Sequence, residues 1–586
     1  MLKRYKSYVI SFIALVIVLA SMLGANFVFA KGQHSSAANT DITSSAKPAT
    51  ARMMSMHTVN MRNVPKAIAK SSHGHPRIIP LRTGVSPAIY AQHKAAAAHN
   101  RNAPVATQLD SATPGARVNT PTVIKSFQGM ADSTSICPPS GCEPPDQALA
   151  ASTSWVLQGV NTSFAVYNTS GTLQSGWPKT AQNFFGVPNP GSCDPNGPFL
   201  SDPRAFYDIN DGRFWAAILQ VEGAFGVACP FRTTYWIAVS QTSDPRGTWN
   251  IYSFDMSNST TNAADYTQFG FDSQAIYFSG NMFDQSGSFF QYAEVFAANK
   301  ATMETGSAVT AHGFFSLKVC SVVCVLVDTV QPVEAETHRY SGPTAGLFVN
   351  SFNISGDPFG DDCSAGVGCH GLAVWAIANP ASTTPSISGA VVSTSTNYVL
   401  APSADEPGCT QCVDTLDTRI SATPPYHNGL ISFALETGTN NGTQVVPGIF
   451  WGQISPVLSA IGAITGATVF QKTIYSSTGD TANSFGALMA DDDGNLFMVF
   501  DRMSSTTNPG VRYASRRATD ALNRFGLSIA LKSGSTATLD SRWGDYGATS
   551  YDGFSGDHVW FSAEYSPSNH DWSTFIGEDQ YTLTAP

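Results

Sequence analysis

From residue 121 onward, apolar and polar residues alternate in short runs that predict β-strands. These runs are rich in β-branched and aromatic residues, and Gly, Asp, Asn or Pro interrupts them every eight to twelve residues. A half-buried strand shows a period of two, and turns need residues with special backbone preferences, so this spacing is typical of all-β domains. No amphipathic helix of convincing length stands out. We therefore predict an all-β domain over residues 121–586.

A longer repeat runs through this domain. In each unit a polar stretch, often containing Asp or Arg, leads into a short strand, a tight turn and a second apolar strand. Two further strand-like runs follow most units. The units begin at Pro144, Ser201, Asp265, His338, Leu416, Asn483 and Arg542, and the fourth is the weakest. Seven such units predict a seven-bladed β-propeller of four-stranded antiparallel blades.

The last unit is one strand short, because the chain ends soon after the run STFIGEDQY. Residues 122–128, TVIKSFQ, belong to no unit. We predict that this N-terminal strand completes the last blade and closes the ring, since it would cover an otherwise unpaired strand edge. The innermost strand of every blade would then begin at one mouth of a central channel, so the leading polar residues should converge there.

The first 120 residues have a different character. Residues 1–30 combine a basic start, an apolar run and a small-residue site ending at Ala30. This pattern predicts a signal peptide, with an uncleaved membrane anchor as the alternative. Residues 31–120 are rich in Ala, Ser, Thr, His and Pro, and hold eleven Lys and Arg against two Asp, a net charge of +9. Composition favours a disordered cationic spacer; a tether to an anionic wall polymer, or a segment that docks on the acidic domain, is the alternative.

Net charge disfavours one class of partner, and the cysteines predict disulfides. Residues 121–586 hold eighteen Lys and Arg against forty Asp and Glu, a net charge of −22, which would repel the phosphates of nucleic acid. An even number of cysteines in an exported chain predicts disulfides. The expected pairs are Cys137 with Cys142, Cys193 with Cys229, Cys320 with Cys324, Cys363 with Cys369, and Cys409 with Cys412. The last pair, spaced CxxC, could instead be a redox dithiol.

Several motifs follow one another in a fixed order. They are PPD from Pro144, DPRAFYDINDGRFW from Asp202, DYTQFG from Asp265, LDTR from Leu416, DDDGN from Asp491, and RWGDY from Arg542 with VWFSAEY after it. In these motifs the chain resembles a family of uncharacterised secreted bacterial β-propeller proteins, over about residues 124–582. It departs from the family by Thr267 and Gln268, where the family has a proline after DY, and by the cysteine-bearing EPGCTQCVD. The resemblance implies a propeller fold and export, and it implies no activity.

A looser likeness is to Asp-box propellers, which have the sialidase-like architecture. The run SDPRGTWNIYSF from Ser243 resembles their hairpin between the third and fourth strands of a blade. In such a hairpin the Asp caps the turn and the Trp packs between blades, so the motif is structural. Residues 491–495, DDDGN, resemble part of a calcium loop, but Arg502 stands where that loop needs a glutamate. A hairpin turn is therefore favoured there.

Three arginines, Arg204, Arg419 and Arg542, lie in the leads of the second, fifth and seventh units. Sialidases grip a carboxylate with three converging arginines, because guanidinium is planar, permanently charged and bidentate. The alternative is that each arginine pairs with a neighbouring aspartate and makes the ring rigid, since buried charges need partners. The motifs DPR, DTR and RWGD all place an Asp within three residues of the Arg.

If the protein is an enzyme, a tyrosine such as Tyr266 or Tyr546 could be the nucleophile and an aspartate the general acid. The candidate catalytic residues are Asp146, Asp202, Asp265 and Tyr546. The candidate ligand-binding residues are Arg204, Tyr266, Arg339, Asp417, Arg419, Arg542, Trp543 and Asp545. We expect no cofactor and no metal site, with a structural calcium on the propeller axis as the alternative.

Two classes of function fit this pattern. In the first, a secreted, monomeric propeller binds an extracellular glycan, a cell-wall polymer or a surface protein at the charged mouth. In the second, it is a sialidase-like glycoside hydrolase that acts on an acidic sugar. The motifs impose no set of acid, base and nucleophile, so binding is the first hypothesis and the question of catalysis stays open at the level of the sequence.

Overall fold

The computed structural model divides the chain into two units, Met1–Asp41 and Ile42–Pro586. The first unit, which includes the predicted signal peptide, lies outside the residues that the structure describes. The described residues are 43–68, 77–78, 82–83, 85–111, 120–133, 136, 142–193, 197–223, 232–258, 260–286, 289–320, 324–336, 342–352, 369–538, 542–552, 558–568 and 571–581.

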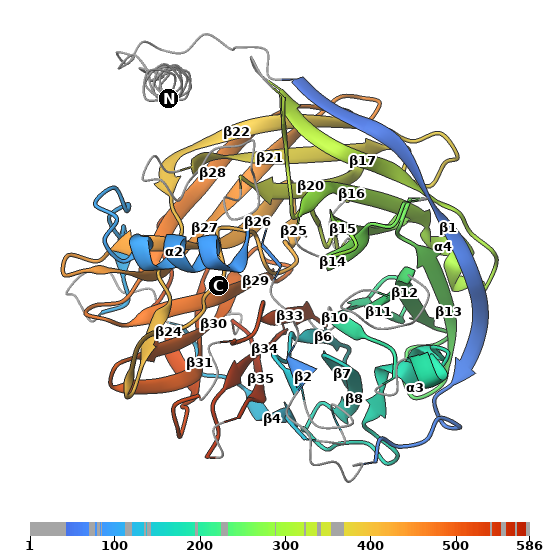
Figure 1. The fold of residues 1–586 in the computed structure, drawn as a ribbon, viewed down its shortest axis with the longest axis horizontal. Coiled ribbons are helices and arrows are strands. Elements are labelled where there is room, and N and C mark those ends of the chain that lie inside the picture. The colour runs from blue at the N-terminus through green and yellow to red at the C-terminus, as the bar shows by residue number, and fades with distance from the viewer. Residues whose placement is uncertain are drawn as a thin grey trace, which may run out of the picture. The chain divides into compact units, whose positions relative to one another are not determined.

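The second unit is all-β and consists of curled antiparallel sheets whose strands mostly follow chain order (Figure 1). One sheet contains β6 (Ala148–Ala151), β7 (Trp155–Val160), β8 (Ser163–Asn168) and β9 (Lys179–Thr180). Two sets that share a ten-stranded sheet are β10 (Leu200–Asp208), β11 (Arg213–Glu222), β12 (Arg232–Ser240) and β13 (Thr248–Asp255), and β14 (Ala263–Phe271), β15 (Ala275–Phe283), β16 (Phe290–Asn299) and β17 (Ala311–Cys320), with β18 (Cys324–Leu326) on β17.

The remaining large sheets repeat this plan. They are β19 (Gln331–Pro332), β20 (Gly346–Ser351), β21 (Cys369–Ala378) and β22 (Ser386–Tyr398); β25 (Tyr426–His427), β26 (Leu430–Asn440), β27 (Val445–Leu458) and β28 (Ile464–Ser476); and β29 (Ala482–Ala490), β30 (Leu496–Ser504), β31 (Thr507–Arg516) and β32 (Ile529–Lys532). The last contains β33 (Ala548–Tyr551), β34 (Val559–Tyr565) and β35 (Ser573–Asp579). Short helices α3 (Ala181–Phe185) and α4 (Lys300–Glu304), the 3-10 turn Gly191–Cys193 and a hairpin of β23 (Ala404–Glu406) and β24 (Cys409–Val413) complete the connections.

The first strands of these sheets follow one another in a closed cycle. β6 contacts β10, β10 contacts β14, and β14 contacts β19. A bridge joins Glu334, just after β19, to Pro425, just before β25, and β26 contacts β29. β29 contacts β33, which in turn contacts β6. Consecutive sheets therefore lie face to face around a common centre.

The hydrophobic core is divided among the spaces between consecutive sheets. Leu157 and Phe164 of one sheet pack with Ile218 of the next, for example, and Trp375 packs with Tyr277 of its predecessor. Both faces of most inner strands are covered, so β15 and β29 are buried at every position. This explains why many strands carry continuous apolar runs in place of strict alternation. The core clusters rest on side chains from neighbouring sheets, so no single sheet can bury its faces alone.

The predicted closing strand is present, three residues further along than expected. β4 (Lys125–Ala131) pairs antiparallel with β35 and is the fourth strand of the last sheet. Gly129 lies where an added Cβ would be 2.4 Å from Gln158 Oε1 and 2.5 Å from Thr574 Oγ1, so only glycine fits this point of the closure. The two ends of the predicted domain, residues 121–586, therefore meet in one sheet, as the strand count predicted.

The predicted disordered spacer over residues 31–120 is wrong for the residues that the structure describes. β1 (Thr43–Asn60) pairs antiparallel with β17 through residues 43–51 and with β13 through residues 52–60. Figure 1 shows it as a long blue strand beside β13 and β17. It joins two neighbouring four-strand sets into one sheet, because each set offers an outer edge of unpaired backbone groups. Composition alone did not reveal those edges.

The rest of this N-terminal part also folds onto the sheets. β2 (Arg77–Ile78) pairs with β5 (Cys142–Glu143), and β3 (Gln108–Leu109) pairs with β28. Between them α2 (Pro87–Ala97) begins with Ser86, whose side chain accepts a hydrogen bond from the backbone N–H of Ile89, and with Pro87 in its first turn. These are normal helix-start signals, so a helix exists where no element was predicted. We call the described residues 43–111 the N-terminal segment.

The fourth unit begins earlier than the sequence suggested. Its first strand is β19 at Gln331–Pro332, and the run AGLFVNS supplies its second strand, β20. The predicted lead residues His338 and Arg339 lie outside the described residues. The residues that take the equivalent place are Asp328 and Thr329, just ahead of β19, where Thr329 has a positive φ of 47°.

Candidate functional site

The polar leads of different units do converge. We call ten of these predicted residues the mouth residues: Asp146, Asp202, Arg204, Asp265, Tyr266, Asp417, Arg419, Arg542, Asp545 and Tyr546. The backbone N–H of Asp545 donates to Asp146 Oδ1 at 2.8 Å, which joins the last unit to the first. The N–H of Thr267 donates to Asp202 Oδ2 at 3.1 Å, which joins the second unit to the third. A side-chain oxygen of one lead thus accepts a hydrogen bond from the backbone of a neighbouring lead.

A repeated backbone feature places these side chains. A residue with positive φ stands at the start of most inner strands: Asp146 (42°), Asp202 (57°), Tyr266 (52°), Thr329 (47°), Leu416 (61°) and Phe485 (58°). The strand register shifts across this point in β10, β14 and β29. Such bulges bend a strand and re-aim a side chain, and strained backbone of this kind gathers at functional sites. No local pattern predicts these positive φ values, because none of the positions is glycine.

The three arginines are paired within the mouth. Arg419 binds Asp417 through two nitrogens, Nε at 2.8 Å and Nη2 at 2.6 Å. Arg542 forms an ion pair with Asp545. Arg204 donates to the backbone oxygen of Ser421 at 3.3 Å. The expectation that arginines pair with neighbouring aspartates is therefore confirmed for Arg419 and Arg542, and the three do not form an open carboxylate clamp in this structure.

The two mouth tyrosines act as flat supports for arginines. The guanidinium carbon of Arg204 lies 3.4 Å from the ring centre of Tyr546, and that of Arg419 lies 4.4 Å from the ring centre of Tyr266. The Tyr546 hydroxyl donates to the backbone oxygen of Pro203 at 3.1 Å. Burial raises the pKa of both phenols well above the ordinary value. Neither hydroxyl donates to a carboxylate base, which disfavours a nucleophilic tyrosine.

The mouth carboxylates hold protons more tightly than usual. Burial, and then repulsion by the Asp545 carboxylate, raise the pKa of Asp146 to about 7. Burial and then Asp265 raise the pKa of Asp202 well above its ordinary value. Burial also raises the pKa of Asp265, although Arg82 opposes this. Carboxylates that repel one another in a water-poor site are typical of functional centres, and they also occur in structural ion-pair networks.

Some buried polar atoms at the mouth have no hydrogen-bond partner. Among the described residues these include Arg204 Nε, Arg419 Nη1, Thr267 Oγ1 and Gln268 Oε1. A buried donor or acceptor without a partner costs about 1–3 kcal/mol, so such atoms mark places where a water or a ligand group would be held. The set contains both donors and acceptors.

The N-terminal segment lies against this mouth. Arg82 Nη1 is 3.4 Å from Asp265 Oδ1, and the two side chains are 4% and 16% exposed. From α2, Lys94 Nζ is 3.2 Å from Asp414 Oδ1 and donates to the backbone oxygen of Leu416 at 2.7 Å. Tyr90 donates to Asp414 as well. Docking on the acidic domain, one of the alternatives for this segment, is therefore what the structure has. Sequence analysis missed Arg82, Lys94 and Asp414 as mouth contacts.

The N-terminal segment also places an acidic residue, Asp110, beside the basic Arg502. Asp110 Oδ2 lies 2.5 Å from Arg502 Nη2, and Asp110 Oδ1 accepts from the backbone N–H of Ser528 at 2.9 Å. Next to this contact a groove of about 230 Å³ lies between β31 and β32, with Arg502, Arg512 and Lys532 in its lining. Opposite charges thus meet at both ends of the docked part.

Trp543 does not offer a face to a ligand. It is 1% exposed, packs with Leu416, Phe485 and Met503, and donates its ring N–H to Asp501 Oδ2 at 3.0 Å. A ring buried this way is part of the core, so its expected role in ligand binding is not supported. The sequence did not reveal this burial, because the partner Asp501 lies on another strand, β30.

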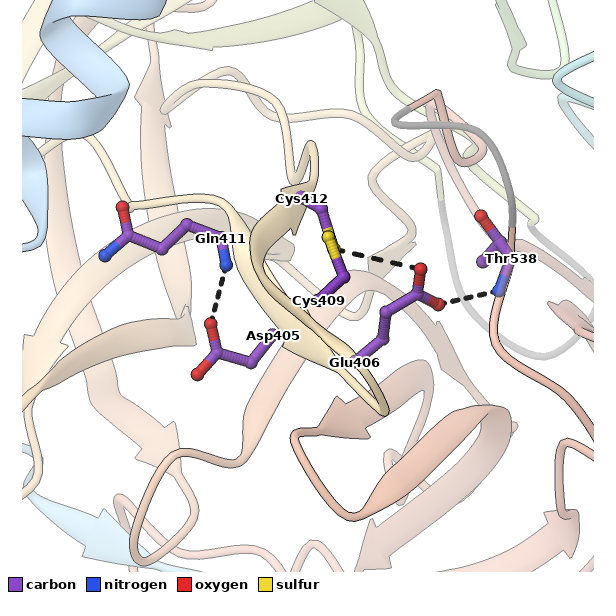
Figure 2. Close-up of a disulfide and its surroundings, with 6 residues drawn as sticks. All are labelled: Asp405, Glu406, Cys409, Gln411, Cys412 and Thr538. Atoms are coloured by element: carbon purple, nitrogen blue, oxygen red, sulfur yellow. Dashed lines mark hydrogen bonds between the residues drawn. A yellow bond between two sulfur atoms is a disulfide. The ribbon is translucent and has the colours of Figure 1, made fainter.

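The hairpin next to the mouth is closed by a disulfide. Figure 2 shows Cys409 and Cys412 joined on this hairpin, with Glu406 lying between Cys412 and Thr538. Glu406 Oε2 accepts from the backbone N–H of Thr538 at 2.7 Å. Chain continuity leads from the disulfide directly to Asp414. The CxxC pair is therefore a staple for the residues that hold α2, and the redox alternative finds no support.

Other expected disulfides are tested in part. Cys320 and Cys324 are joined, as predicted. Cys142 and Cys193 each take part in a disulfide. The expected partners Cys137 and Cys229, and Cys363 of the remaining pair, lie outside the described residues.

Two groups of side chains have the composition of a metal site. They are Asp552, His558 and Glu578, and Asp208, Asp211 and Glu304. In the second group Lys300 already supplies the positive charge, because its Nζ forms ion pairs with Asp208 and Asp211. Neither group contains a mouth residue. The DDDGN run forms the turn between β29 and β30, where Asp491 accepts from the backbone N–H of Asn495, as predicted.

The Asp-box-like hairpin lies between β12 and β13, as predicted. Trp249 is fully buried and donates its ring N–H to the backbone oxygen of Pro245, and Asp244 caps the turn through the N–H of Arg246. The motif is structural here. Among the described residues, no helix is both long and apolar enough to span a lipid bilayer.

Comparisons with known proteins give a distant likeness. No family model and no curated protein matches the chain in sequence. Among solved structures, the endosialidase of phage phi92 has a TM-score of 0.35 at 8% identity, covering 76% of this chain and 68% of its own. A protein of unknown function from Dyadobacter fermentans scores 0.34 at 10% identity, with 65% and 94% covered. A sialidase of Trypanosoma rangeli scores 0.30 at 11% identity, with 74% and 58% covered. Likenesses this distant carry no argument about function.

Proposed function

We propose that this chain is an exported, seven-bladed β-propeller that binds an extracellular glycan or cell-surface polymer at the mouth. The blade count follows if each four-strand set is one blade and the ten-stranded sheet is two blades joined by β1. Export rests on the signal-peptide pattern of residues 1–30 and on the disulfides.

One observation carries the binding function. Side chains from several sheets bring three guanidinium groups, two phenols and a set of carboxylates into one buried cluster, and this cluster keeps donors and acceptors without partners. Hydroxyl-rich ligands such as sugars match a site of this kind, because each hydroxyl both donates and accepts.

A hydrolase is the second candidate, and one observation favours it. The pKa of Asp146, raised to about 7 by burial and by Asp545, suits a general acid that works near neutral pH. The hydroxyl of Tyr546 donates to a backbone oxygen and its pKa is raised, which speaks against the tyrosine nucleophile of the sialidase hypothesis. Binding therefore stays the first proposal.

The test is a glycan panel presented to the secreted full chain. It should contain neutral, sialylated, uronic-acid and amino-sugar polymers, with affinity and soluble fragments both measured. The variant Arg542→Gln should lose at least tenfold in affinity, while Arg512→Gln in the groove beside β32 should not. Fragments that disappear in Asp146→Asn would establish the hydrolase. If no glycan binds to folded protein, the proposal is wrong.

A further inference from the structure

Among the described residues, carboxyl groups outnumber guanidinium groups at the mouth. Six carboxylates meet there, those of Asp146, Asp202, Asp265, Asp414, Asp417 and Asp545, against the three guanidinium groups of Arg204, Arg419 and Arg542. Two of the carboxylates, Asp265 and Asp414, take their cations from the N-terminal segment: Arg82 reaches Asp265, and Lys94 reaches Asp414. Without that segment, Asp265 and Asp414 would each lose the cation that forms an ion pair with it.

Arg82 behaves like a bound ligand group. It lies in the connection ahead of α2, is almost fully buried, and meets a carboxylate that Asp545 repels and Arg419 and Arg542 attract. Its position is flanked by β2, which pairs just ahead of Asp146, and by α2, which is held by Asp414. Because Arg82 is buried and paired with Asp265, the position beside Asp265 accepts a positive charge.

The remaining polar atoms define the rest of the ligand. Arg204 Nε and Arg419 Nη1 are donors in need of an acceptor, and Gln268 Oε1 is an acceptor in need of a donor. A lysine or arginine side chain offers only donors, so it would leave the two arginine nitrogens without partners. A sugar that carries an ammonium group offers both, since its hydroxyl oxygens accept and its ammonium donates.

We propose that the mouth binds glycans with free amino groups, with the ammonium on Asp265, and that Arg82 is its intramolecular competitor. This inference rests on the proposed function and names its ligand class. It differs from the sialidase hypothesis in the sign of the charge, because an acidic sugar would meet a surplus of carboxylates. Removal of the Arg82 side chain should make the Asp265 carboxylate accessible to a ligand without disturbing the sheets.

The test compares secreted full-length protein with three variants. Arg82→Gln removes the competitor, Asp265→Asn removes the partner of the ammonium group, and Arg101→Gln is the matched control, an exposed arginine of the same segment. The probes are a glucosamine hexamer, its fully N-acetylated form, a galacturonate hexamer and a hexalysine peptide. Calorimetric titration at mildly acidic pH gives the affinities, and circular dichroism checks the fold.

We expect Arg82→Gln to bind the glucosamine hexamer at least tenfold more tightly than wild type and Arg101→Gln. The double variant Arg82→Gln, Asp265→Asn should lose this gain, and the N-acetylated hexamer should gain nothing in any variant. Equal gains for the amino and N-acetylated forms would overturn the inference, as would tightest binding of the galacturonate hexamer or of hexalysine.

The two proposals fail in different ways. If a neutral or acidic glycan binds and Arg542→Gln weakens it, the mouth is a glycan site and only the amino-sugar inference is wrong. If none of the glycans binds to folded wild type or to Arg82→Gln, the proposed function itself is wrong. Tight binding of hexalysine alone would assign the mouth to a basic peptide.

Discussion

The two halves of the N-terminal segment dock on the same domain by different means. β1 is held by backbone pairing along β13 and β17, and its inward side chains include small or polar residues such as Ala49 and Ser55 beside the apolar Met53. Residues 82–97 are held by side-chain contacts of Arg82, Tyr90 and Lys94 with acidic residues of the mouth.

Because the two halves are held by different interactions, they differ in whether a competing ligand can displace them. A strand that covers a sheet edge is held by backbone hydrogen bonds, so its attachment depends little on the charge of its side chains. Ion pairs respond to pH, to salt and to competing cations. We therefore expect β1 to be a permanent part of the fold and residues 82–97 to be the displaceable part.

The largest effect should follow deletion of β1. Removing residues 43–60 leaves two strand edges unpaired, and we expect most of the protein to shift from monomer to larger species at micromolar concentrations. Sedimentation velocity measures this, and a chain that begins at residue 43 is the control. A deletion variant that stays monomeric would show that other residues protect these edges.

The second effect is a pH dependence that belongs to the mouth, because β1 contains no Asp or Glu. The pKa of Asp146 is raised to about 7 by burial and by Asp545, whereas the unfolded value is about 4. Between these values the folded state holds a proton that the unfolded state has lost, so stability falls as pH rises from 4 to 7. Asp146→Asn should flatten this slope by up to about 1.4 kcal/mol per pH unit in urea unfolding. An unchanged slope would contradict the raised pKa.

A lysine pair compares the two halves directly. Lys94→Met removes contacts with Asp414, Thr415 and Leu416, and we expect the free energy of unfolding to fall by about 2 kcal/mol. Lys47→Met, on an exposed position of β1, should change it by less than about 0.5 kcal/mol. Equal losses would mean that charge holds both halves.

The smallest effect should come from salt. Raising NaCl from about 0.05 M to about 1 M should increase hydrogen exchange in α2 by a few fold and leave β1 unchanged, since buried pairs are screened only in part. Mass spectrometry of peptides from each half gives the rates. Faster exchange in β1 than in α2 would reverse the comparison.

The sequence predicted one of the two N-terminal strands and missed the other, for a physical reason. β4 was predicted because the last unit lacked a strand and TVIKSFQ looked like one. β1 alternates in burial, but Ser55 and His57 face inward whereas Met54 and Met56 are exposed, so its apolar period is weak. Its stability comes from the edges that it covers, and the sequence of β1 does not contain them.

The sequence predicted which side chains meet at the mouth, but it did not predict their backbone conformation, their partners or their burial. Leads such as Asp202 and Arg419 could be found because each precedes a strand at a repeated place in its unit. The positive-φ bulges, the contact of Arg82 with Asp265 and the burial of Trp543 depend on distant residues, so no local pattern announces them. The shifted start of the fourth unit shows the same limit, because Thr329 resembles an ordinary strand residue.

The position of β1 and β4 at the start of the chain has a consequence for how the molecule forms. Thr43 pairs with Cys320, and Lys125 pairs with Glu578, so both strands are made long before their partners. Contacts between residues so far apart slow folding, because the connecting chain must first be brought together. During synthesis these two strands remain without a partner, and the ring can close only when the last sheet has arrived. We therefore expect the pairing of β4 with β35 to be a late folding event.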